Sequence, residues 1–547
     1  MNSNSLRPKL WIVYSVLALL IASFVSGDVQ VPLGHFSKPS RRVAVIGAGA
    51  AGSNTAYSLR KYADASSTPV DITVFERASY IGGRSTTVNV FGNPAYPVEL
   101  GASIFVQANY NLVNASRDLG LEVSSASQSR PRESEDVIGV WDGKEFVFRM
   151  QDTYSWWNIA KLIWQYGWAP VRTQNLMKAT VNKFLQLYEE PIFPFKSLTA
   201  AAVRVGLLNT TATRGSEFLN LNHVSADFSR EIIQASTRVN YGQNLGLIHG
   251  LEAMVCMATD GAMAIQGGNW RLFEAMLKAS RAVVKLNHTV ASVEQNVDGT
   301  LTVAYSRNSD NTAQEELIFD EVVIAGPMQY SGISITPAPD HAPDKIPYVQ
   351  LYVTLFSSPH QLSPKYFNLQ ETDARAPETI LTTLPRGVDL GSNEKGVGPA
   401  NFWSISTLQT VLSEDQHGET HYVYKIFSPE RPSAQFMREI LGLQHPNGAS
   451  AADNTTIVDL TKEDISWYHE KIWNPYPFLH PRVTFEEAIL SPHLWYTGGI
   501  ESFISTMETS AHMGKNVAAL MLQSWREEEE LHKRDEPVSD GKSRTEL

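Results

Sequence analysis

Three glycines in the amino-terminal part of the chain have the spacing of a dinucleotide-binding loop. Gly47, Gly49 and Gly52 form a G-x-G-x-x-G motif directly after an apolar run at 43–46. In such loops the first glycine permits a tight turn, the second lets the backbone approach a pyrophosphate, and the third allows close packing of helix on strand. An ordinary glycine-rich turn can show the same spacing, so the flanking residues decide between the two.

The flanking residues favour nucleotide binding. A helical pattern at 53–60 follows the glycines, and a second strand pattern at 71–75 ends at Glu76, which is 24 residues past Gly52 (76 − 52). An acid at this distance accepts hydrogen bonds from ribose hydroxyls, while the helix amino-terminus faces the phosphates. The sequence therefore predicts a Rossmann-like nucleotide-binding unit.

Composition excludes other classes of chemistry. The 547 residues carry 45 Lys and Arg against 57 Asp and Glu, a net charge of −12, which disfavours a nucleic-acid partner. The single cysteine, Cys256, lies between Met254 and Met257 and is expected to be a buried residue with a packing role. We find no Cys/His spacing of a metal site and no Ser/His/Asp triad, and expect no metal.

The stretch from Glu76 to Thr86 decides which nucleotide is expected. Its Gly82-Gly83-Arg84 run resembles the signature of glutathione-reductase-like FAD oxidoreductases, in particular the amine oxidase and phytoene desaturase branch. The glycines let the chain pass close to the cofactor, and Arg84 can place its guanidinium against the pyrophosphate, or form a surface salt bridge instead. The run at 99–103 resembles a loop that passes near the flavin ring in these enzymes.

Two distant segments complete this resemblance. Val290, before an alternating strand pattern, resembles the residue whose backbone contacts the adenine, and Gly499 and Glu501 precede a helical pattern at 505–522 whose amino-terminus would face the flavin pyrimidine. Taken alone, each segment could equally be a plain strand or helix cap. The residues expected to bind the cofactor are Gly47, Ala48, Gly49, Ala51, Gly52, Glu76, Arg77, Gly83, Arg84, Gly101, Ala102, Ser103, Val290, Gly499 and Glu501.

A tryptophan-rich helical pattern marks the middle of the chain. Trp157, Trp164 and Trp168 are spaced i, i+7 and i+11 and share one helix face. Such a face is typical of an aromatic core helix; the alternative is the wall of a lipid tunnel or a surface that faces a membrane.

Four runs, at 238–243, 266–269, 424–428 and 499–511, resemble the prenylcysteine oxidase family, also called prenylcysteine lyase. The resemblance extends from about Val43 to about Leu522. It implies a FAD-dependent thioether oxidase that takes farnesyl- or geranylgeranylcysteine and O₂, and releases cysteine, a prenyl aldehyde and H₂O₂. Candidate partners for the amino-acid end of the substrate are Arg238, Asn240, Tyr241 and Gln243, with an internal salt bridge as the alternative role of Arg238.

Other functions stay open at this stage. An amine oxidase or desaturase would share the whole amino-terminal fingerprint, and a family member could act on another lipid thioether or a secondary metabolite. A flavin-bound carrier without turnover is a further alternative. No acid or base residue, chain-length preference or oligomeric state follows from the sequence.

The expected fold is α/β, with a Rossmann-like FAD-binding domain of the glutathione-reductase type and an inserted α+β substrate domain. We expect a signal peptide at 1–27, a linker at 28–40, the FAD-binding domain at 41–150, 261–330 and 486–524, a mainly helical substrate segment at 151–260, the rest of the substrate domain at 331–485, and a charged tail at 525–547.

The two ends of the chain indicate the compartment. Basic residues, an apolar run of about 15 residues and then small residues have the order of a cleaved signal peptide, and the run is shorter than the ~20 residues of a membrane anchor. We expect the secretory pathway, with lysosome or vacuole implied by the resemblance, secretion or the endoplasmic reticulum as alternatives, and peripheral membrane contact as an option. The N-x-[ST] sequons that would carry glycans there are Asn114, Asn209, Asn287 and Asn454.

Overall fold

The fold is taken from a computed structural model. The structure describes residues 39–125, 136–151, 155–309, 314–370, 375–391, 396–413, 418–444 and 455–535. Within these ranges, none of the helices has the length and apolar character needed to span a bilayer.

A six-stranded sheet assembled from distant parts of the chain forms the nucleotide-binding half. Its central strand β1 pairs in parallel with β2 on one side and β13 on the other, and Val43, Ala44 and Val45 are fully buried. Such an apolar central strand is typical of a parallel sheet that is covered on both faces. The strand order is β20 (Ile489–Ser491), β21 (Leu494–Tyr496), β13 (Glu321–Ile324), β1 (Arg41–Ile46), β2 (Val70–Glu76), β9 (Val283–Leu286).

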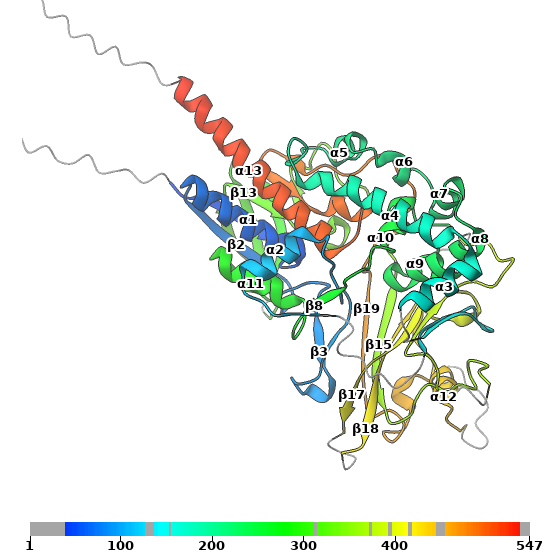
Figure 1. Ribbon diagram of the computed structural model, residues 1–547. Coiled ribbons are helices and arrows are strands. Elements are labelled where there is room, and N and C mark those ends of the chain that lie inside the picture. The colour runs from blue at the N-terminus through cyan, green and yellow to red at the C-terminus, as the bar shows by residue number, and fades with distance from the viewer. Residues whose placement is uncertain are drawn as a thin grey trace, which may run out of the picture. The chain divides into compact units, whose positions relative to one another are not determined.

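Helices from both ends of the chain cover this sheet. Helix α13 (Met507–Asp535) packs along α1 (Ala50–Ser66), and α11 (Trp270–Ser280) packs on the other side of α1 (Figure 1). At Gly514, α13 approaches α1 so closely that a Cβ atom on this glycine would lie 2.2 Å from the carbonyl oxygen of Ala51. The expected Rossmann-like α/β fold, built from both ends of the chain, is confirmed.

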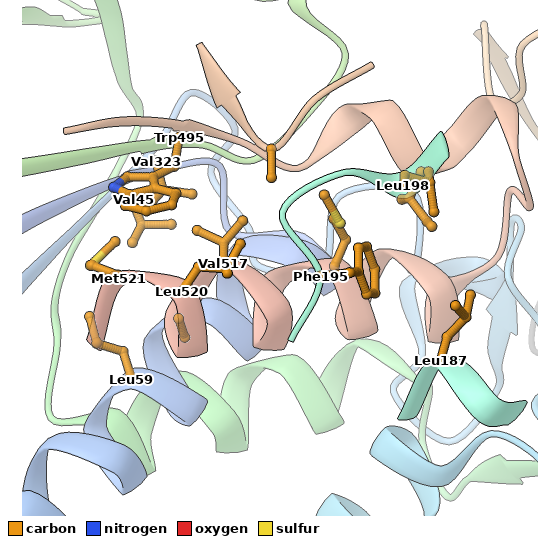
Figure 2. Close-up of a cluster of buried hydrophobic side chains, with 14 of the residues drawn as sticks. Val45, Leu59, Leu187, Phe195, Leu198, Val323, Trp495, Val517, Leu520 and Met521 are labelled. Carbon is orange, nitrogen blue, oxygen red and sulfur yellow. The ribbon is translucent and has the colours of Figure 1, made fainter. Parts of the chain in front are cut away.

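One hydrophobic core joins the sheet, these helices and part of the helical layer. Figure 2 shows side chains of α13 pointing toward the sheet and α1, with a segment from the middle of the chain closing the cluster. The residues that meet there include Val45, Leu59, Leu187, Phe195, Leu198, Val323, Trp495, Val517, Leu520 and Met521.

A second, seven-stranded sheet forms the other half of the molecule. It is antiparallel except for the parallel pair β16 and β6. Because β6 and β7 pair in this sheet, residues 136–151 belong with the substrate half, and the boundary expected at residue 150 is too late. The strand order is β19 (Trp467–Trp473), β15 (Leu351–Ser358), β18 (Thr420–Ser428), β17 (Ser404–Leu412), β16 (Thr379–Thr382), β6 (Asp136–Trp141), β7 (Phe146–Gln151).

A layer of helices lies beside the seven-stranded sheet (Figure 1). Trp164 is 88% and Trp168 66% exposed, which contradicts the aromatic-core interpretation for both; the side chain of Trp157 lies outside the described residues. The layer comprises α3 (Ser155–Tyr166), α4 (Ala169–Leu185), α5 (Leu198–Arg204), α6 (Leu208–Thr211), α7 (Gly215–Leu221), α8 (Ala226–Phe228), a π-helical turn (Ser229–Ile233), α9 (Gln234–Tyr241) and α10 (Gly250–Val255).

Smaller elements complete the described fold. A four-stranded sheet has the order β12 (Gln314–Phe319), β11 (Leu301–Arg307), β10 (His288–Gln295), β14 (Ser334–Thr336). Two further antiparallel pairs join β3 (Thr87–Asn89) to β4 (Pro97–Glu99), and β5 (Val123–Ser125) to β8 (Met263–Ile265), which is distant in sequence. In sequence, helix α2 (Tyr110–Asp118) lies between β4 and β5, and α12 (Ala434–Leu441) lies between β18 and β19.

The end of α13 corrects the expected start of the charged tail. Trp525 is 2% exposed, and its Nε1 donates to Glu321 at 2.7 Å, as does Nε1 of Trp495. Helix α13 therefore anchors to the sheet at Trp525 and continues to Asp535. The sequence favoured a boundary at 525 because charged residues begin there, yet a charged helix face and a buried tryptophan coexist on α13.

Candidate active site

One cavity of about 1410 Å³ is lined by both halves of the molecule. Its walls come from the glycine loop, the end of β2, the 82–104 segment, the end of α9, strands β17 to β19 and the loop before α13. Of the residues expected to bind cofactor or substrate, those that line it are Gly47, Gly49, Ala51, Glu76, Arg77, Gly83, Arg84, Gly101, Ala102, Ser103, Asn240, Tyr241, Val290 and Glu501. Those that do not are Ala48, Gly52, Arg238, Gln243 and Gly499.

The glycine loop has the shape that a pyrophosphate requires. Gly47 has φ +115°, and a Cβ at Gly52 would lie 1.9 Å from the carbonyl oxygen of Gly47, so neither position accepts a side chain. Gly49 is different, because a Cβ there would meet only Gly82 and Gly83, both at 4.0 Å. The open space above Gly49 is therefore a cradle between two glycine turns, which fits a diphosphate.

The acid at the end of β2 is positioned by backbone donors. Ala48 N–H donates to Glu76 Oε2 at 2.9 Å, and Ala78 N–H donates to Oε1 at 2.8 Å. Each carboxylate oxygen keeps a lone pair for a ribose hydroxyl. Ala48 does not line the cavity, but its N–H helps to position the carboxylate of Glu76.

Arg84, whose side chain is partly exposed, forms an ion pair with a buried acid. Its Nη1 and Nη2 donate to the carboxylate of Glu501, which is 4% exposed, and Nη1 also donates to the carbonyl of Pro475. Burial lowers the pKa of Arg84, but the charge of Glu501, its hydrogen bond to Arg84 and the nearby Tyr348 and Tyr476 together raise it above the ordinary value. The salt-bridge alternative for Arg84 is thus what the structure shows, but it lies at the cavity wall rather than on the surface.

Strand β10 and the start of α13 also contribute to the cavity wall. Val290 on β10 and Arg77 both line the cavity, and Nη1 of Arg77 donates to the carbonyl of Tyr330 at 2.9 Å. Thr506 and Met507 at the start of α13 line the cavity, so the positive end of the helix dipole faces it. Gly499 lies behind this wall, where a Cβ would be 2.7 Å from a backbone oxygen of Glu486.

Two of the four substrate candidates have structural roles instead. Arg238 is fully buried and donates to Thr382 Oγ1, Asn244 Oδ1 and the carbonyl of Val397, and burial lowers its pKa to about 9. Gln243 is also fully buried and exchanges hydrogen bonds with the backbone at 477 and 479. The structure argues against substrate contact by either, because both end groups are satisfied inside the fold.

Sequence reasoning did not single out an acid and a lysine that line the cavity. Burial raises the pKa of Glu99 to about 7, although Asn269 N–H and the charge of Lys425 lower it. Glu99 Oε1 accepts from Asn269 N–H at 2.6 Å, whereas Oε2 is buried without a hydrogen-bond partner. Lys425 on β18 donates to the Glu99 carbonyl and to Ser103 Oγ, each at 3.2 Å. The runs at 99–103 and 424–428 include both residues, but the sequence does not indicate that the two lie close together.

A second buried acid stands behind Tyr241. Glu252 on α10 is fully buried, neither of its oxygens has a partner in hydrogen-bond geometry, and burial raises its pKa to about 8. The Tyr241 hydroxyl and the backbone of Ser505 are the polar groups that approach it, and both residues line the cavity. Glu252 is therefore mainly a neutral acid near pH 7.

Comparison with known proteins places the chain in a family. The model of the prenylcysteine lyase family matches residues 149–536, and that of an NAD(P)-binding Rossmann-like domain matches residues 45–117. This chain belongs to the prenylcysteine lyase family. The resemblance seen in the sequence is thereby confirmed.

Its relatives match over nearly their whole length. Farnesylcysteine lyase of Arabidopsis thaliana is 29% identical, with 90% of each chain covered. Prenylcysteine oxidase 1 of Homo sapiens is 27% identical over 89% of this chain and 90% of the relative. Prenylcysteine oxidase 1-like of Homo sapiens is 25% identical over 97% and 98%.

Solved structures share the fold at low identity. Putrescine oxidase bound to putrescine has a TM-score of 0.51 and 16% identity, covering 89% of this chain and 99% of that one. Cyclohexylamine oxidase from Brevibacterium oxydans has a TM-score of 0.53 and 15% identity, covering 89% and 100%. The fold, the Rossmann-like match and the glycine cradle together indicate a flavin cofactor.

We predict that Gly49→Trp abolishes flavin binding, because the indole occupies the cradle between the two glycine turns. Glu76→Ala should weaken retention more mildly, since ribose contacts are only part of the binding. Flavin absorbance per protein after gel filtration measures both. A full flavin complement in a folded Gly49→Trp protein would contradict the assignment.

Glu252→Gln should change how stability depends on pH. Since burial raises the pKa of Glu252 from 4.5 to about 8, the folded state holds a proton that the unfolded state releases between these values. The free energy of unfolding of the wild type therefore falls as pH rises through this window, by at most about 1.4 kcal/mol per pH unit for one proton. The neutral amide removes this contribution.

Chemical unfolding at pH 5, 6, 7 and 8 measures the difference. Glu274→Gln, an exposed acid on α11, is the matched control and should reproduce the wild-type slope. Parallel slopes for wild type and Glu252→Gln would show that Glu252 is ionised in the folded state.

Proposed function

We propose that this chain is a FAD-dependent oxidase that cleaves farnesyl- or geranylgeranylcysteine. The observation that carries the proposal is that one cavity joins a dinucleotide cradle to a wall with both apolar and charged side chains. Membership of the prenylcysteine lyase family and the names of the relatives support this substrate class. With O₂ and water, the products are cysteine, a prenyl aldehyde and H₂O₂.

The substrate half of the cavity suits a lipid with a zwitterionic end. Leu408, Phe427, Ile472 and Trp473 supply apolar and aromatic surface for a prenyl chain, which has no polar group to bind. Length discrimination then depends on burial of CH₂ groups at about 0.8 kcal/mol each. A long cavity of this kind tolerates both 15- and 20-carbon chains.

The cofactor and the chain divide the reaction between them. When bound, FAD accepts a hydride from the prenyl carbon attached to sulfur. The chain's own residues orient the thioether, admit one water and provide proton acceptors. Glu99 meets the last requirement, because it lines the cavity and burial raises the pKa of its carboxyl to about 7, so this group can take or return a proton near neutral pH.

The substrate class is tested by anaerobic bleaching of the bound flavin. Farnesylcysteine should reduce the flavin, whereas putrescine and a carotenoid precursor should not. Released cofactor should be FAD, and readmission of air should restore the absorbance with H₂O₂ formed. Bleaching by the amine and not by the thioether would favour an amine oxidase, and no bleaching by any substrate would favour a carrier.

We further predict that Lys471 holds the substrate carboxylate. Its ammonium lies over the Trp473 ring at 5.9 Å, and both residues line the cavity. Lys471→Met should lower kcat/KM for farnesylcysteine, with a loss of transition-state stabilisation of about 1.5 to 3 kcal/mol, and FAD content should be unchanged.

The methyl ester of farnesylcysteine provides the matched comparison. The wild type should prefer the free acid, while Lys471→Met should treat acid and ester alike. An unchanged preference in the variant would place the carboxylate elsewhere, for example at Asn240 or Tyr241, which keep their positions at the cavity.

We also propose that the chain enters the secretory pathway and acts in a lysosome or vacuole. Asn114, Asn209 and Asn287 are exposed, which supports their use as glycan acceptors; Asn454 and the expected signal peptide lie outside the described residues. Protein from a eukaryotic host should begin near residue 28 and lose mass on glycosidase treatment. An intact Met1 together with no glycan at any sequon would contradict this.

A further inference from the structure

A stretch of the helical layer differs in charge from the rest of the chain. Residues 155–188 contain no Asp or Glu but carry Lys161, Arg172, Lys178 and Lys183, within a chain of net charge −12. All four lysine and arginine side chains are exposed. None forms a salt bridge with a carboxylate of the described residues. Their positive charge is thus not neutralised within the described fold.

Exposed tryptophans lie on the same stretch. Trp164 at the end of α3 is 88% exposed and Trp168 before α4 is 66% exposed, with Val171 exposed beside them. Among tryptophans whose side chains the structure describes, no other is exposed. Large aromatic side chains in water are unfavourable, so their retention points to a partner.

The inner faces of these helices are already fully packed. Tyr166 is buried against Phe228, with ring centroids 5.2 Å apart, and its hydroxyl donates to Glu231 at 2.7 Å. Ala169 and Met177 on α4 are buried in the same core. The exposed tryptophans are therefore not needed to complete the protein's own core.

We propose that these residues form a docking surface for an anionic lipid bilayer. The surface, here called the α3–α4 surface, consists of Lys161, Trp164, Trp168, Val171, Arg172 and Lys178. Tryptophan favours the interface between lipid headgroups and acyl chains, and lysine and arginine beside it are attracted to anionic headgroups. The combination favours a membrane, because a bilayer accommodates indole rings at its interface and attracts cations at its anionic headgroups with one surface.

The surface is connected to the cavity by packing. Tyr166 of α3 contacts Phe228 and Glu231, and the π-helical turn that contains Glu231 continues directly into α9. The last residues of α9, Asn240 and Tyr241, line the cavity. The inference that docking brings a membrane-borne lipid to this site rests on the proposed function, whereas docking itself does not.

Vesicle binding by the flavin-loaded full chain tests the proposal. The wild type should sediment with vesicles of equimolar phosphatidylserine and phosphatidylcholine, and weakly with phosphatidylcholine alone. Trp164→Ser with Trp168→Ser should reduce binding at least tenfold. Val297→Ser with Val458→Ser, two exposed apolar residues outside this surface, is the matched control and should bind like the wild type.

A second pair of variants tests how much positive charge contributes to vesicle binding. Lys178→Glu should weaken binding to the anionic vesicles about 25-fold, because reversal removes two charge units and each contributes about fivefold. Lys278→Glu, the same change at an exposed position on α11, should have little effect. Added salt should abolish the difference between the two variants.

Three results would overturn the proposal. In the first, the double tryptophan variant binds vesicles as well as the wild type does. In the second, the wild type binds neutral and anionic vesicles equally. In the third, the tryptophan changes convert a dimer to a monomer, which would make the surface a contact between two copies.

Flavin content and turnover of detergent-dispersed farnesylcysteine should be unchanged in all variants. Absent turnover with intact vesicle binding would refute the proposed function and leave the docking surface standing.

Discussion

The ion pair between Arg84 and Glu501 is the interaction on which the geometry of the cavity depends. It ties the loop after the glycine motif to the loop before α13, and Tyr348 and Pro475 from the substrate half complete its hydrogen bonds. A buried carboxylate is costly unless it is paired, so Glu501 constrains both loops to their observed positions. Four segments of the chain thus meet at one charge pair.

Burial acts on three carboxyls at or near the cavity wall. The pKa is raised to about 7 for Glu99 and Glu508 and to about 8 for Glu252, in each case chiefly by burial. Of these three, only Glu99 lines the cavity, which is also lined by Glu76 and Glu501. Backbone N–H groups hold the carboxylate of Glu76, and Arg84 holds that of Glu501. Desolvation thus reduces the negative charge of the three buried acids near neutral pH, while hydrogen bonds and an ion pair compensate the other two.

Local motifs allowed much of the cofactor site to be predicted. Gly47, Gly49 and Glu76 are separated by fewer than 30 residues, and strand, turn and helix bring them together without help from the rest of the fold. The substrate site could not be predicted in this way. Arg238 lies two residues from Asn240, yet it points into the interior, because its guanidinium finds three acceptors there.

The sequence by itself determined the nucleotide-binding unit, the family resemblance and the involvement of both ends of the chain, since each depends on short runs whose spacing has a direct geometric meaning. Only the tertiary structure decided that β6 and β7 join the substrate sheet, that Glu99 and Lys425 meet at the cavity, and that Trp164 and Trp168 face solvent. Strand partners and the outward direction of a helix face depend on contacts between segments that are distant in sequence, such as β6 with β16 and Tyr166 with Phe228. Periodicity identifies a face, but the surrounding fold determines what that face contacts.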